Sequence, residues 1–122
     1  MLLNAGLIGI GGALGSVTRY LFSLMLRSYL PGVVFAGTLV VNVVGCFLIG
    51  SLSSYAEKHI LSQSPAFLFL STGILGGLTT FSAFGLESVT LFQNQQLIQA
   101  LGSVFLNLGL GFGAVLLGRC VF

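Results

Sequence analysis

Two pairs of polar side chains recur at helical spacing inside stretches that are otherwise apolar. Thr38 and Asn42 are spaced i, i+4, and Ser103 and Asn107 repeat that spacing later in the chain. Hydroxyl and carboxamide groups supply neutral hydrogen-bond donors, so two such stripes can replace the water around a small anion. The same groups also form hydrogen bonds between packed helices. The second stripe favours a lined anion path over helix packing alone.

A run rich in glycine, threonine and phenylalanine lies between these stripes, from Gly73 to Phe84. Glycine loosens a helix, and β-branched threonine adds strain. Unwound backbone is tolerated at membrane depth only where it is buried in protein or lines a polar cavity. We therefore expect a helix break at mid-membrane, where freed carbonyl groups can hold a cation.

Phe81 and Phe84 follow the expected break at i, i+3 and share one helix face. Aromatic pairs at this spacing are usually packing contacts. However, an aromatic ring has a positive edge, and two edges facing a narrow path can partly solvate a small anion. A fixed positive charge would hold the ion too tightly, whereas conduction requires weak sites.

Two ionisable residues flank this region. Arg19 lies two helical turns before Arg27, about 12 Å inside the end of its span. It extends to the headgroups, forms a positive vestibule that attracts anions, or bonds to a helix end. Glu87 follows Phe84 by three residues and lies in a water-filled mouth or at the membrane interface.

The composition identifies an integral membrane protein of one domain. Of 122 residues, 56% are hydrophobic and only 5% are charged, against about 25% in a soluble domain. The net charge of +2 is too small to indicate a nucleic-acid partner. Cys46, Cys120 and His59 form no metal pattern, and the sequence contains no nucleophile–base pair, so we expect no enzyme activity.

Four segments are long and apolar enough to cross a membrane, which takes about 20 residues. They predict an all-α membrane protein with four transmembrane helices, the third broken, and with both termini on one side. The expected spans are about 2–26, 32–55, 65–92 and 97–118. Glycines at 6, 9, 12 and 15 on the first span and at 109, 111 and 113 on the fourth indicate close helix packing.

The basic residues are almost evenly divided between the two sides. One side carries Lys58 and Arg119, and the other carries Arg27 with Arg19 deeper in the span. Orientation normally follows an excess of basic residues in cytoplasmic loops. We therefore expect insertion in both directions and pairing as an antiparallel, dual-topology homodimer.

Three motifs in this order resemble the Fluc (CrcB) family of fluoride channels. They are GGALGSVTRY at 11–20, GTLVVNVVG at 37–45 and GGLTTFSAF at 76–84. The resemblance covers the whole chain in length, span count and motif order. It implies an antiparallel homodimer in the inner (plasma) membrane, with two pores that export cytoplasmic fluoride passively.

The resemblance also implies roles for individual residues. Phe81 and Phe84 would contact fluoride through their ring edges, with Asn42 as a pore donor and Thr38 and Ser82 beside it. Carbonyl groups of Gly76 and Thr79 from both subunits would hold a structural sodium ion, and Arg19 would lie near a vestibule. The chain departs from the family at Ala83, Ser103 and Asn107, which lie along the polar track.

Two other functions remain open on the sequence. A small proton-coupled multidrug exporter also has about four spans, but it needs a carboxylate deep in the membrane, and the chain has only Glu57 and Glu87. A non-transporting assembly subunit would suit the glycine-rich faces, but it would give the polar stripes no purpose. Flux driven by a proton gradient, or no flux at all, would identify these alternatives.

Overall fold

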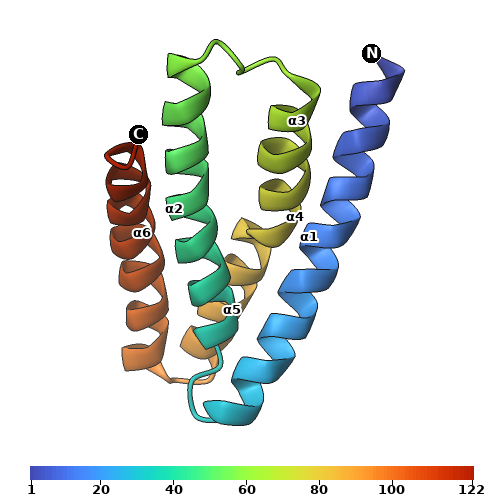
Figure 1. Cartoon of the computed structure of the whole chain (residues 1–122). Helices are drawn as coiled ribbons and strands as arrows, with labels where there is room; N and C mark the ends of the chain where they lie inside the picture. The colour runs from blue at the N-terminus through green and yellow to red at the C-terminus, as the bar shows by residue number, and fades with distance from the viewer.

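The computed structural model covers residues 1–122 and consists of helices and short connectors. Four helical stretches are long and apolar enough to span a membrane, which confirms the predicted all-α membrane fold. They are α1 (Leu2–Tyr29), α2 (Ala36–Lys58), the segmented third span (Pro65–Gln93) and α6 (Leu97–Arg119). Figure 1 shows both chain termini and the α2–α3 connector at one end of the molecule, with the other two connectors at the opposite end.

Proline and serine determine where two of these helices begin and end. The first helix runs to Tyr29, three residues past the expected end, and stops just before Pro31. Residues preceding proline disfavour the helical conformation, so 30–35 form turns and α2 starts at Ala36 instead of near residue 32. The third span starts with Pro65 in its first turn, where Ser64 Oγ accepts a hydrogen bond from Phe67 N at 3.2 Å.

The third span is built from four helical pieces. Its first half comprises α3 (Pro65–Leu68), the π-helix η1 (Phe69–Leu75) and α4 (Gly76–Leu78), and its second half is α5 (Phe81–Gln93). Thr79 and Thr80 between them are extended, with ψ of 156° and 123°. The predicted break is therefore confirmed in the middle of the span. The π-helix was not predicted, although such segments often occur near functional sites.

Glycines bring α1 into backbone contact with the first half of the third span. A Cβ atom on Gly11 would lie 3.0 Å from Gly73 Cα, and one on Gly15 would overlap the Ile74 carbonyl oxygen. Of the expected ridge over 6, 9, 12 and 15, only Gly12 and Gly15 contact the third span, whereas Gly6 and Gly9 face open space. Three residues advance a helix by about 300°, so the spacing drifts off the face by about 60° per step.

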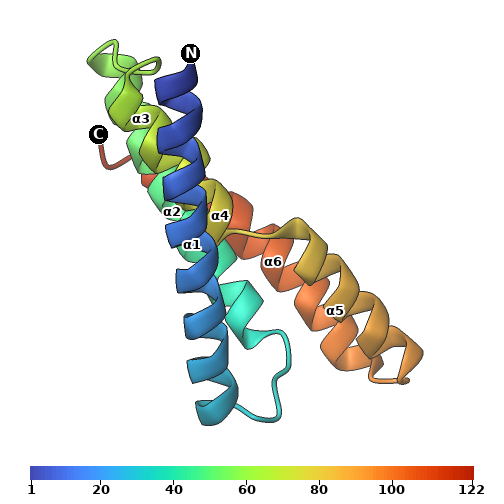
Figure 2. The ribbon, with the colours of Figure 1, turned by 90° about the vertical axis from the view of Figure 1, so that its right-hand side faces the viewer.

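The second close contact joins α2 and α6. A Cβ atom on Gly50 would overlap the Val115 carbonyl oxygen, and one on Gly118 would overlap that of Phe47. On α6, Gly109 and Gly113 meet nothing within 4 Å, so only Gly111 of the three expected glycines faces α2. Beyond the break, α5 packs along α6, and the two helices diverge together from α1 (Figure 2).

Candidate functional site

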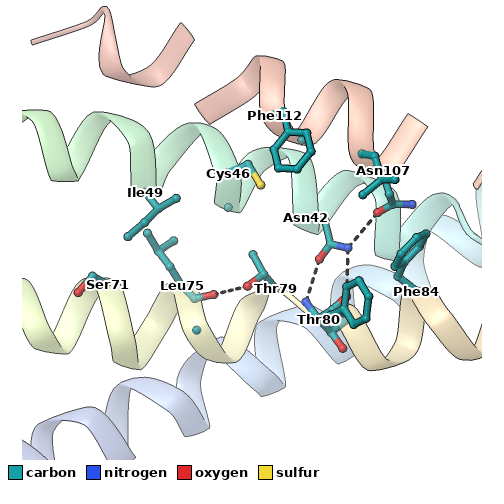
Figure 3. A pocket seen from close by; sticks show the side chains of 15 residues that line it. Asn42, Cys46, Ile49, Ser71, Leu75, Thr79, Thr80, Phe84, Asn107 and Phe112 are labelled. Atoms are coloured by element: carbon teal, nitrogen blue, oxygen red, sulfur yellow. Dashed lines mark hydrogen bonds between the residues drawn. The ribbon is translucent and has the colours of Figure 1, made fainter. Parts of the chain in front are cut away.

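A hollow of about 540 Å³ opens beside the break in the third span. Figure 3 shows its walls, which come from α2, the first half of the third span, the start of α5, and α6. Asn42, Thr80 and Asn107 contribute polar groups to the lining, and Phe81 and Phe84 contribute aromatic rings. Its fifteen lining residues include no carboxylate, lysine, arginine or histidine. The wall of this hollow is therefore neutral, with polar groups beside aromatic rings.

Asn42 forms three hydrogen bonds and ties the break to two other helices. Its Oδ1 accepts from Thr80 N at 2.8 Å, and its Nδ2 donates to Thr80 O at 3.1 Å. The other Nδ2 hydrogen goes to Asn107 Oδ1 at 2.9 Å. The backbone N–H and C=O of Thr80 fix the orientation of this amide, because one requires an acceptor and the other a donor. Asn42 thereby replaces the helical hydrogen bonds that the extended residue has lost (Figure 3).

Two carbonyl groups lose their helical donors as a consequence. In an unbroken helix, Gly76 O would accept from Thr80 N, and Thr79 O would accept from Ala83 N. Here Thr80 N donates to Asn42, and Ala83 N donates to Thr80 Oγ1 at 3.2 Å. The carbonyls of Gly76 and Thr79 are the two that the family resemblance assigns to a sodium ion. Both residues line the hollow, and neutral carbonyl oxygens suit a hard monovalent cation.

The two phenylalanines of the motif form an edge-to-face pair at the break. Their ring centroids are 5.4 Å apart with an interplanar angle of 63°. Phe84 is buried at 8% exposure, whereas Phe81 is 79% exposed. The pair therefore links the interior of the helix packing to the open side of the hollow.

The remaining predicted residues form smaller groups. Below the hollow, Thr38 Oγ1 donates to Glu87 Oε1 at 2.8 Å, and the other oxygen of Glu87 is buried without a partner. Ser103 is fully buried and shares a 2.9 Å hydrogen bond with Ser88. Ser103 therefore lies in the helix packing and does not face the hollow.

The other two predicted residues lie apart from the buried polar groups. Ser82 is exposed and bonds Thr80 Oγ1 at 3.2 Å. Arg19 on α1 forms no ion pair and lies outside the lining of the hollow.

A family model described as "CrcB-like protein, Camphor Resistance (CrcB)" matches residues 6–119 of the chain. The chain belongs to the CrcB family. Proteins named "Fluoride-specific ion channel FluC" are similar to it over nearly their whole length. The one from Rhizobium meliloti is 46% identical, with 92% of this chain and 90% of the relative covered. Those from Clostridium perfringens and Agrobacterium fabrum are 38% and 40% identical, covering 97% and 99% of this chain and 92% and 100% of the relatives.

This CrcB-family chain is a multi-pass protein of the plasma membrane, as its four spans and its family membership indicate.

Several residues that line the hollow were not predicted from the sequence. Thr80 is the N-cap of α5, where its hydroxyl accepts a hydrogen bond from Ala83 N. Threonine is a preferred residue at this position, so the sequence did carry a signal for it. Cys46 and Phe112 also line the hollow. No motif pointed to these two residues, because apolar residues on membrane helices are the rule.

Proposed function

We propose that the chain is a passive fluoride-selective channel that exports cytoplasmic fluoride. The observation that carries this proposal is the neutral lining of the hollow, where carboxamides and two phenylalanine rings meet at a helix break. The names of relatives at 38–46% identity support the same ion. Because these names describe an ion channel, they also agree with the expectation that the chain is not an enzyme.

Buried polar groups and the phenylalanine pair mark a route through the second half of the third span. From the α5–α6 end, it passes Thr38 and Glu87, then Phe84, and then Phe81 with Asn42 and Asn107 at the break. Thr38 and Asn42 are one turn apart on α2, and Glu87 and Phe84 are one turn apart on α5. Fluoride loses water along this route and gains contacts in single steps.

Asn107 supplies the uncommitted amide donor on this route. One of its N–H groups donates to Ser103 O at 2.9 Å, and the other remains for an anion. Both N–H groups of Asn42 are already donated, so Asn42 holds the break and orients Asn107 through its Oδ1. The ring edges of Phe81 and Phe84 contact the ion with partial positive charge alone, so that it can leave again.

The neutral lining also explains why the flux would be passive. Proton-coupled export needs a titratable carboxylate deep in the membrane. Glu57 lies at the end of α2 in a bidentate ion pair with Arg119, at 3.1 and 2.9 Å, and Glu87 is bonded to Thr38. Fluoride enters cells as neutral hydrogen fluoride and is trapped as an anion, so a negative membrane potential suffices to drive it out.

The proposal includes an antiparallel homodimer with two pores and a central sodium ion. One chain offers the carbonyls of Gly76 and Thr79, and a second copy across a two-fold axis would complete a neutral cage of four. Sodium would supply a positive charge that fixes the two breaks against one another. Arg19, which forms no ion pair within the chain, would lie in a vestibule where its charge attracts fluoride.

Fluoride efflux from liposomes that contain the purified protein tests the function. With a potassium gradient and an ionophore, we expect fast fluoride loss without chloride loss. Phe81→Ile should abolish the flux, and Phe105→Ile should leave it intact, because Phe105 is 69% exposed and lies outside the hollow. A folded dimer without fluoride flux, or flux that requires a proton gradient, would refute the channel.

Labelling of single loop cysteines from one face of intact cells tests the dual topology. Partial labelling at both ends of the molecule is the expected result. Uniform one-sided labelling would rule out the antiparallel pair while leaving the channel function open. The sodium ion is tested separately, by dimer stability in sodium against potassium or lithium salts.

A further inference from the structure

A third phenylalanine, Phe112 on α6, lines the hollow together with Phe81 and Phe84. It is 71% exposed, close to the 79% of Phe81. Figure 3 shows it projecting from α6 near Cys46, beyond Asn42 and Asn107. The ring therefore stands one layer past the carboxamides, on the opposite side of them from Phe84.

Hydrogen-bond donors are scarce in that layer of the hollow. Ser71 Oγ donates to Phe67 O at 2.7 Å, and Thr79 Oγ1 donates to Leu75 O at 3.0 Å. Both hydroxyls are thus committed to carbonyl groups of their own helix. An anion that has passed Asn107 finds no free hydroxyl donor there. The ring of Phe112 is the aromatic group with a positive edge at this level.

The fit of α6 against α2 sets the position of this ring. The neighbouring Gly111 faces α2, where an added Cβ would lie 3.6 Å from Cys46 Sγ. Gly113 on the other side of the ring meets nothing within 4 Å. The residue between them is directed along the open side of the hollow, and its ring reaches the lining.

We propose that Phe112 is a third aromatic contact for the ion, which takes over from Phe81 and Phe84 once the anion has passed the carboxamides. This inference rests on the proposed function, because it assigns a further residue to the same path. It predicts that the ring itself is needed, since an aliphatic side chain of similar size has no positive edge.

Variants of the full chain in liposomes test the inference against a matched control. Phe112→Leu removes the ring and keeps an apolar side chain, Phe112→Tyr keeps the ring, and Phe105→Leu makes the same change one heptad earlier on α6, outside the hollow. We expect Phe112→Leu to slow fluoride efflux on the order of tenfold, the scale of one aromatic edge contact. Phe112→Tyr and Phe105→Leu should stay within about twofold of the wild type, and all variants should elute as the wild-type oligomer.

Equal rates for Phe112→Leu and Phe105→Leu would overturn the inference while the wild type still conducts. Loss of the oligomer in Phe112→Leu, with flux lost in proportion, would also overturn it, because the ring would then be a subunit contact. Absence of flux in the wild type would instead overturn the proposed function, and with it the role of Phe112. The wild-type arm therefore separates the two failures.

Discussion

Replacement of Asn42 by leucine should destabilise the fold more than any other single polar substitution in the membrane span. The change removes three hydrogen bonds, of 2.8, 2.9 and 3.1 Å. Interhelical hydrogen bonds in membranes contribute on average about 0.6 and at most about 1.7 kcal/mol each. We therefore expect a loss of about 2 to 5 kcal/mol in the free energy of unfolding. The loss should fall in the upper part of that range, because the N–H and C=O of Thr80 are left without partners, and each unsatisfied buried group costs about 1–3 kcal/mol.

Reversible unfolding in mixed micelles, followed by circular dichroism during titration with dodecyl sulfate, measures this loss. Thr38→Val is the matched control, because it removes one part-buried hydrogen bond, to Glu87, one turn earlier on the same helix. We expect it to cost about 0.6 kcal/mol. If Asn42→Leu unfolds at the same dodecyl sulfate concentration as Thr38→Val, the hydrogen bonds of Asn42 do not stabilise the break. Its importance would then lie in contact with the ion alone.

Three further experiments probe the break and its surroundings. Thr80→Val should lower the free energy of unfolding by about 1 kcal/mol in the same titration, because it removes the cap of α5. Thr80→Ser should retain the cap. Equal losses of stability in the two variants would exclude capping. Gly15→Ala should lower the free energy of unfolding by about 1–3 kcal/mol through overpacking. Gly9→Ala should be neutral, because Gly9 faces open space. A larger loss for Gly9→Ala than for Gly15→Ala would contradict the packing of α1. In a Cys120→Ser background, methylthiolation of Cys46 should slow fluoride efflux severalfold, and unchanged flux would place the ion path elsewhere than the hollow.

The break itself was predictable because its causes are local. Glycine and paired threonines weaken a helix wherever they occur, and a threonine hydroxyl can cap the helix that restarts after them. The family motifs also marked the phenylalanine pair and Asn42. Each of these signals is contained in a few consecutive residues, so no knowledge of neighbouring helices was needed.

The hydrogen-bond partners of the polar side chains were not predictable, because they depend on which helix lies opposite. Asn42 appeared as a free donor in the sequence, whereas both of its N–H groups are bonded. Ser103 appeared as a lining residue, whereas it is fully buried against Ser88. Spacing along one helix indicates a shared face. It does not indicate whether that face meets a path or another helix.

The contacts of the glycines on α1 were not predictable from their spacing either. Gly11 and Gly15 touch the third span, but Gly6 and Gly9 do not, and their spacing alone could not separate them. A period of three residues moves halfway round a helix between positions 6 and 15. Only the partner helix determines which part of such a ridge is used.

The open side of the hollow has a consequence for the assembly. Phe81 and Phe112 are mostly exposed there, and the carbonyls of Gly76 and Thr79 lack their helical donors. Unpaired backbone groups at this depth cannot face hydrocarbon, so they must be covered by protein or line a water-filled cavity. A second copy turned end for end is the partner that best fits the proposed function, because two basic residues at each end leave insertion unbiased. The same pairing would close the path against lipid and bring four unpaired carbonyls together, so that one geometric feature would account for both the pore and the cation.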